Sequence, residues 1–174
     1  EMTLSSKLFS DDMDDGVVAG TGTNSLTFAG DLSRFYGTVN DFSNLTFATD
    51  NTLNATFNAT KAINVTGAIT LGEKATLTAG TLAITGTTEK AASLTLNSGT
   101  QLDTITGGIT LTHGKLSGVT LAANKTIVAN AGAALENVTL AENSTLTVAQ
   151  NGGSLTFTGT NTLAGTLEVF NSVD

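Results

Sequence analysis

A three-residue motif recurs along the whole chain: an aliphatic residue, a threonine, and then leucine or phenylalanine. Successive copies begin 17 to 25 residues apart, and one extra copy, Ile109–Leu111, lies inside the fourth interval. A repeat of this length predicts a fold in which each unit buries its apolar face against its neighbours. The seven main copies are Leu26–Phe28, Leu45–Phe47, Ile69–Leu71, Leu94–Leu96, Val119–Leu121, Val138–Leu140 and Leu155–Phe157.

The similarity between repeats extends beyond this motif. Residues 119–126 read VTLAANKT and residues 138–145 read VTLAENST. Residues 69–78 read ITLGEKATLT, against VTLAENSTLT for residues 138–147. Because these segments agree over eight to ten positions and share the same short polar turn, we interpret them as true repeats rather than as chance matches in a threonine-rich chain.

The local pattern inside a repeat predicts β-strands. Leu146 and Val148 share one face of a strand, whereas Thr145 and Thr147 share the other. Between such strands lie asparagine and glycine, which tolerate the positive φ angles of tight corners. Apolar residues nowhere keep helical spacing for three turns. The chain is therefore expected to be all-β, with corners such as Asn97–Gly99, Asn130–Gly132 and Asn151–Gly153.

Short strands separated by turns could build either an antiparallel sandwich or barrel, or a solenoid. The repeat length matches one coil of two or three strands, and a sandwich has no reason to repeat its own sequence. The absence of proline also suits uninterrupted strand stacking. We predict a parallel β-solenoid of about seven coils, which at ~4.8 Å per coil forms a rod of roughly 30–35 Å.

Stacked coils would align equivalent positions of the motif. The first and third motif residues are expected to form two interior columns, and the middle threonines to form one outward ladder. Such a ladder is the candidate interaction face, a hydroxyl surface for contact with another copy, a glycan or ice. The alternative is that threonine is simply a favourable polar residue for the solvent face of a strand. The ladder residues are Thr27, Thr46, Thr70, Thr95, Thr120, Thr139 and Thr156.

The beginning of the chain does not follow the repeat. We divide the sequence into an acidic N-terminal cap or lead-in, residues 1–24, and solenoid repeats, residues 25–174. The acids of Asp11–Asp15 do not match the spacing of a D-x-D-x-D-G calcium loop, so a hydrated acidic cap is favoured over a calcium site. A cap is expected there because a bare solenoid end is an aggregation edge.

Charge and composition argue against several classes of partner. The net charge is −8, and the seven Lys and Arg residues are spread singly, so neither nucleic acid nor an anionic membrane surface is expected to bind. No apolar run approaches the ~20 residues of a membrane-spanning helix, so membrane insertion of this segment is not expected. The chain has no cysteine, which excludes disulfides and thiolate chemistry. No cofactor or metal site is predicted.

Residues 25–39 carry a family resemblance. They read SLTFAGDLSRFYGTV, which resembles the autotransporter-associated β-strand repeat. The Gly-, Thr- and Asn-rich coils that follow are similar to autotransporter passenger domains more generally, so that the resemblance covers the chain from about Ser25 onwards. It implies a right-handed parallel β-helix on the outside of a Gram-negative cell, often an adhesin or a stalk.

The sequence gives little support for catalysis. His113 is the only histidine, it stands beside Gly114, and no G-x-S-x-G nucleophile elbow accompanies it. The alternative function is a fragment of a β-helical polysaccharide lyase or hydrolase, a class of enzyme that needs clustered acids with a cation on one face. Here Arg34 is the only arginine, and the candidate acids are scattered over separate coils: Asp31, Asp41, Asp50 and Asp103. We therefore expect a non-catalytic structural or adhesive segment at the cell surface, whose partners are other copies or surface glycans.

The inside–outside assignment predicts two very different substitution effects. Leu140→Asp should abolish cooperative folding, because an unpaired charge would enter a water-free column at a cost of several kcal/mol. Thr139→Ser, on the solvent face of the same strand, should cost less than about 1 kcal/mol. Thermal unfolding followed by circular dichroism compares them, and equal melting shifts would refute the assignment.

Overall fold

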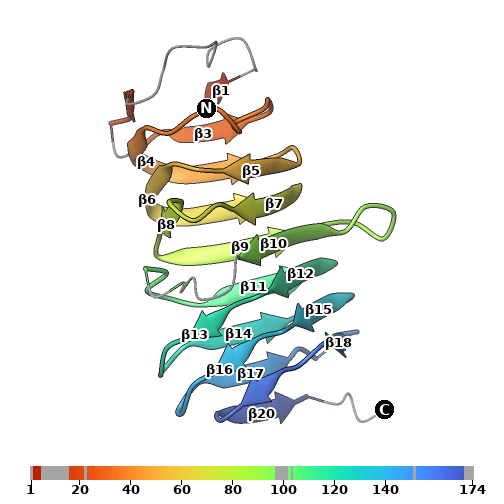
Figure 1. Cartoon of the computed structure of the whole chain (residues 1–174). Coiled ribbons are helices and arrows are strands. Elements are labelled where there is room, and N and C mark those ends of the chain that lie inside the picture. The colour runs from red at the N-terminus through yellow and green to blue at the C-terminus, as the bar shows by residue number, and fades with distance from the viewer. Residues whose placement is uncertain are drawn as a thin grey trace.

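The computed structural model describes residues 2–4, 16–21, 23–96, 102, 104–150 and 152–170. Within these ranges the secondary structure is entirely β, without a helix. Parallel sheets stack into a β-solenoid of about seven coils, which runs from the N-terminal end in red to the C-terminal end in blue (Figure 1). The predicted parallel β-solenoid is thereby confirmed.

Three parallel sheets form the walls. The first sheet has the strand order β1-β3-β4-β6-β9-β11-β14-β17-β20, with β2 also paired to β4 and β8 to β6. Its strands are β1 (Met2–Leu4), β2 (Val17–Ala19), β3 (Ser25–Phe28), β4 (Thr38–Phe47), β6 (Thr56–Val65), β8 (Thr76–Thr78), β9 (Thr81–Thr85), β11 (Ile109–Thr112), β14 (Thr126–Ala129), β17 (Thr145–Val148) and β20 (Thr166–Val169).

The other two sheets complete each coil. The second sheet runs β18-β15-β12-β10-β7-β5, and the third runs β13-β16-β19. The second consists of β5 (Asn51–Leu53), β7 (Ala68–Leu71), β10 (Ala92–Leu96), β12 (Gly114–Ser117), β15 (Ala133–Glu136) and β18 (Leu155–Thr158). The third consists of β13 (Thr120–Leu121), β16 (Thr139–Leu140) and β19 (Thr162–Leu163).

Inward side chains stack like on like along the axis. In the first sheet one interior column consists of leucine and isoleucine from Leu26 onwards, and the parallel register places each residue directly over the next. Up to Leu146 the members of this column are buried. Because every position of this column is apolar, successive coils exclude water between them there. The column is Leu26, Leu45, Ile63, Leu82, Ile109, Ile127, Leu146 and Leu167.

Aromatic residues fill the first coils. The Phe28 and Phe47 rings stack with centroids 5.2 Å apart, and the Phe57 ring meets both of them edge-on. Stacked and edge-to-face pairs are the arrangements that aromatic quadrupoles favour. All three side chains are fully buried. The N-terminal part of the rod is therefore filled by rings, and the rest mainly by aliphatic side chains.

The expectation that all seven motifs stack on one another, with their flanking residues in the same two interior columns, is wrong. The first two motifs lie in the first sheet, Ile69–Leu71 and Leu94–Leu96 lie in the second, and Val119–Leu121 and Val138–Leu140 contribute to the third. Leu155–Phe157 returns to the second sheet. The motif is a signal for a half-buried strand, and each coil has several such strands, so it can occur on any face. Up to the sixth copy, the flanking residues are buried and the middle threonines face outward, as expected.

Two strands before residue 25 join the first sheet. β1 pairs with β3 and β2 pairs with β4, both in parallel. Residues 2–4 and 17–19 therefore continue the sheet toward the N-terminal end. The acidic cluster Asp11–Asp15 lies outside the described residues.

The last coil is open at its C-terminal side. Phe157 is 43% exposed, whereas its partner in the preceding coil, Leu135, is fully buried. Leu163 is 37% exposed, whereas its partner in the preceding coil, Leu140, is 1% exposed. Leu167 is 48% exposed, whereas its partner in the preceding coil, Leu146, is fully buried. These pairs occupy equivalent positions, so the difference in burial comes from the absence of a further described coil above the last one. A residue in the middle of the stack is buried by two neighbours, and one at the end by a single neighbour.

This gradient predicts that one substitution has different costs along one column. Leu163→Asp should leave the fold intact with a reduced melting temperature, because solvent already reaches that side chain. Leu140→Asp, at the partner position in the preceding coil, should abolish cooperative folding. Circular dichroism melts of the two variants test this, and equal losses would contradict nearest-neighbour burial.

Candidate functional site

The outward face of the first sheet carries a shallow groove at its N-terminal end. Its volume is about 360 Å³, and uncharged polar side chains make up the whole lining. We call it the polar groove, and its residues are Thr23, Asn24, Ser25, Thr27, Asn44, Thr46 and Asn64. Thr23 and Asn24 directly precede β3. Strands β3, β4 and β6 place the other five side chains outward because their alternate positions, such as Leu26 and Leu45, point into the core.

Hydrogen bonds between coils fix the amides of the groove. The Asn44 amide donates to the Ser25 hydroxyl at 3.0 Å, and the Asn64 amide donates to the Thr46 hydroxyl at 3.5 Å. An amide has two N–H donors and a carbonyl acceptor, and a hydroxyl can both donate and accept. The groove therefore offers neutral donors and acceptors side by side, which suits a hydroxyl-rich ligand better than an ion.

The predicted threonine ladder is divided among the three sheets. Thr27 and Thr46 are neighbours in the polar groove, but the next position in their row is Asn64. Thr70 pairs with Thr95 in the second sheet, and Thr120 pairs with Thr139 in the third. Thr156 lies beside Ala134. The seven residues therefore do not form one face, because successive motifs belong to different sides of the coil.

The motif-based prediction missed two asparagines of the polar groove, Asn44 and Asn64. Asn44 precedes the second motif by one residue and lies directly above Ser25, which precedes the first motif. A parallel alignment of the two segments one coil apart would have paired them. Asn64 could not be found in this way, because its segment, Ile63–Val65, has asparagine where the motif has threonine.

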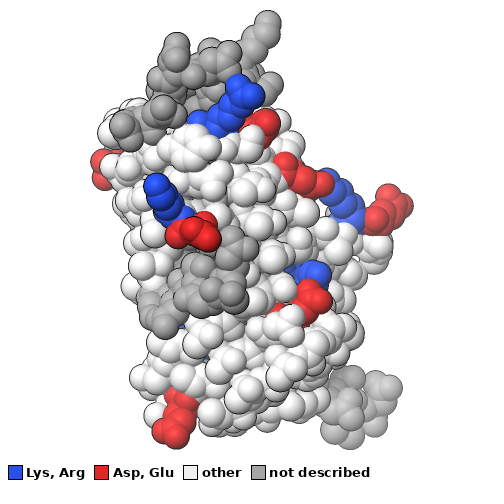
Figure 2. Space-filling model, viewed as in Figure 1, with Lys and Arg blue, Asp and Glu red and all other residues white. Residues whose placement is uncertain are grey.

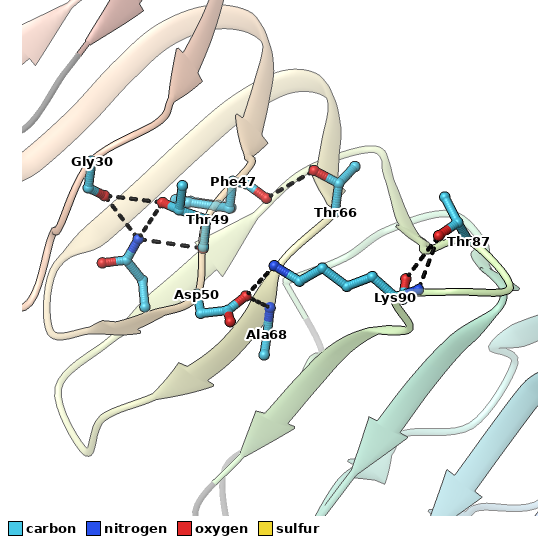
Figure 3. Close-up of polar contacts among 9 residues, drawn as sticks. Gly30, Phe47, Thr49, Asp50, Thr66, Ala68, Thr87 and Lys90 are labelled. Carbon is cyan, nitrogen blue, oxygen red and sulfur yellow. Dashed lines mark hydrogen bonds and ion pairs between the residues drawn. The ribbon is translucent and has the colours of Figure 1, made fainter.

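A chain of polar contacts joins four successive coils at the corner between the first and second sheets (Figure 3). The amide of buried Asn51 donates to the Gly30 carbonyl at 2.9 Å, and its oxygen accepts the Leu32 N–H at 2.6 Å. Asp50 accepts the Ala68 N–H at 2.8 Å and pairs with Lys90 at 3.2 Å. These bonds satisfy corner backbone groups that have no strand partner, so they stabilise the register between coils.

Hydrogen bonds hold the pKa of three carboxyl groups below their usual range: those of exposed Asp31 and Asp50 and of half-buried Glu136. For Asp50 the main cause is the Ala68 N–H, followed by the Lys90 ammonium. For Asp31 it is the Ser33 N–H. For Glu136 it is the Lys115 ammonium, 2.9 Å away, followed by the Ser117 hydroxyl. All three stay ionised at neutral pH and bond to their own neighbours, as expected of structural carboxylates.

His113 and Asp41, two further candidate residues, belong to different coils. His113 occupies a corner with φ of 44°, and its backbone N–H donates to the Ala131 carbonyl at 2.7 Å. Its ring covers Gly132. Asp41 also has a positive φ, 62°, at the bulge in β4. Asp103 lies outside the described residues. Among the residues that are described, no three His, Asp or Glu side chains gather where they could hold a metal ion.

Charged side chains are sparse on the face seen in Figure 2, where they stand singly or as mixed-sign neighbours between wide uncharged areas. In the described part of the chain, no helix is long and apolar enough to cross a membrane. Comparison with known proteins gave no match to a family model, a curated protein or a solved structure.

The Asp50 contacts predict an acid-dependent loss of stability. A carboxyl whose pKa is lower in the folded than in the unfolded state stabilises the fold above its unfolded pKa, and this contribution disappears as the pH falls through the folded pKa. The melting temperature should therefore fall below about pH 4, near the ordinary Asp value. Asp50→Asn should reduce this dependence, whereas Lys90→Gln should retain most of it because the Ala68 N–H remains. Equal pH profiles for wild type and Asp50→Asn would contradict this assignment.

Proposed function

We propose that the chain is a non-catalytic, extracellular structural or adhesive β-solenoid, displayed at the bacterial cell surface, that binds glycans weakly along its side. The observation that carries the proposal is the polar groove: an uncharged, amide- and hydroxyl-lined hollow on the wall of a rigid rod. The resemblance of residues 25–39 to autotransporter-associated repeats supports the location and the passenger-like role.

The chemistry of the groove favours a glycan over a charged ligand. Its lining has no cation to pair with phosphate or carboxylate and no acid to hold a metal ion. The groove is shallow and lacks an aromatic ring, so a single contact would be weak. Many rods on one surface would raise the overall binding through avidity without any new contact.

Association with other copies belongs to the same proposal but follows a different dependence on salt. The net charge of −8 opposes close approach of two copies. Raising the ionic strength from 0.01 M to 0.15 M shortens the Debye length from about 30 Å to about 8 Å, so self-association should strengthen with salt. Sedimentation velocity at the two salt concentrations measures this.

Retention on immobilised neutral polysaccharide tests the glycan proposal, with two asparagines of β6 as a matched pair. Asn64 lines the groove, whereas Asn58 lies outside it; both are half-buried and donate to the preceding coil. Asn64→Ala should lower retention, and Asn58→Ala should leave it unchanged. Equal retention of the two variants would contradict a role for the groove.

The alternative function, a fragment of a polysaccharide lyase or hydrolase, makes an opposite prediction. Incubation of the purified chain with pectin-like substrates should release no new reducing ends. Measurable release, or micromolar one-to-one binding of a small sugar, would overturn the structural and adhesive proposal.

A further inference from the structure

One corner of the rod is notched because consecutive coils use corners of different length. Asn54 alone separates Leu53 from Ala55, whereas Gly72, Glu73 and Lys74 occupy the equivalent corner of the next coil, between Leu71 and Ala75. The register of both flanks, Leu53 with Leu71 and Thr56 with Thr76, leaves no doubt about the equivalence. The connection in the coil before is also longer: residues 33–37 lead to Thr38, the partner of Thr56, through a turn closed by the Phe35 N–H and the Leu32 carbonyl.

The short corner between two longer ones leaves a hollow of about 350 Å³. We call it the corner notch, and it is lined by Tyr36, Asn54, Glu73 and Lys74. Its volume falls in the range of about 300–1,000 Å³ that small-molecule sites occupy. Each of three successive coils therefore contributes to one site, although the residues are far apart in sequence.

The Asn54 amide at the centre of the notch is held in place. Its nitrogen donates to the Ser33 carbonyl at 3.1 Å. Its oxygen lies over Gly72, where a Cβ atom would stand only 2.1 Å away, so any larger residue at position 72 would displace the amide. The second N–H of the amide and the lone pairs of its oxygen remain for a ligand in a fixed orientation.

Tyr36 gives the notch an aromatic wall. Tyr36 is 49% exposed. The other exposed aromatic side chains among the described residues, Phe157 and Phe170, belong to the open C-terminal end of the rod. Tyrosine combines a large apolar face with a polar tip, which makes it effective where a ligand is partly apolar and partly wet.

We infer that the corner notch binds one pyranose ring of a neutral glycan. A pyranose has apolar C–H faces and a rim of hydroxyl groups, and the notch matches both: the Tyr36 ring for a face, and an amide, a carboxylate and an ammonium for the rim. Glu73 and Lys74 are adjacent and opposite in charge, so together they favour a neutral ring over a charged one. This inference rests on the proposed glycan binding and assigns it a second, aromatic site.

The chain offers a direct probe of this site. Tyr36 is the only tyrosine and the chain has no tryptophan, so tyrosine fluorescence reports on the notch alone. Titration of the 174-residue protein with cellobiose should change this fluorescence saturably, with a dissociation constant of about 1–10 mM. An unchanged signal at saturating sugar would overturn the inference.

Two glutamate variants test whether cellobiose binds in the corner notch. Glu73→Gln should weaken cellobiose binding by about fivefold, the effect of a hydrogen bond to a ligand. Glu142→Gln is the matched control, because Glu142 occupies the same position in the equivalent turn, closed by the Ser144 N–H and the Ala141 carbonyl at 3.3 Å. Glu142→Gln should bind as wild type does, and equal weakening of the two variants would overturn the assignment.

Replacing Tyr36 removes the fluorescence signal, so the role of its ring in cellobiose binding is tested by amide chemical shifts instead. Tyr36→Phe should keep cellobiose-dependent shifts at Gly72, and Tyr36→Ala should lose them while keeping its melting temperature. Preferential binding of an anionic digalacturonate over cellobiose would overturn the neutral-ring assignment. If cellobiose binding fails but polysaccharide retention still depends on Asn64, the notch is refuted and the proposed function stands.

Discussion

The structure depends on one interaction: the contact of each coil's inward side chains with the same positions of the coil before. Because leucine, isoleucine, valine and phenylalanine repeat at those positions, every added coil buries the previous one and leaves a new apolar surface of its own. Contacts extend mainly to the nearest coils, so the rod has no single centre. The same rule accounts for the exposed Leu163 and Leu167, which among the described residues have a strand partner on one side only.

The corners fix the register of one coil over the next. Apolar stacking by itself does little to fix the register of one coil over the next, since neighbouring interior positions hold similar residues. Directed hydrogen bonds do so, as where Asn51 bonds to Gly30 and Asp50 bonds to Ala68. Because the corners lie outside the columns, their length can vary without disturbing the stack. That freedom produces the corner notch at Asn54.

Much of the fold could be predicted from the sequence, because the alternation around Leu146 and the long segment repeats are local signals. The distribution of the motifs over three sheets could not. The 24-residue step from Leu45 to Ile69 crosses from the first sheet to the second, whereas the 25-residue step from Ile69 to Leu94 is one coil that includes the turn from Thr87 to Lys90. Similar spacings therefore conceal different geometry.

The candidate sites were less accessible to sequence reasoning for the same reason. The motif predicts Thr27 and Thr46 as outward residues, but the groove also needs Asn44 and Asn64, and these become neighbours only when the coils are aligned. The corner notch brings Tyr36 beside Glu73, which no local motif predicts. A site that spans coils is set by the register of the stack, and the register follows from corner lengths.

The stacking order of the coils can be measured directly, because the chain has no cysteine and accepts a pair of spin labels without interference. Thr52 and Thr158 lie in one row of the second sheet, related through Thr70, Thr95, Ser117 and Glu136. Five steps of ~4.8 Å place their backbones about 24 Å apart. Double electron–electron resonance on the Thr52→Cys/Thr158→Cys protein should give one narrow distance near this value, after allowance for the label arms. A broad distribution, or a distance that places the two strands side by side, would contradict the parallel stack.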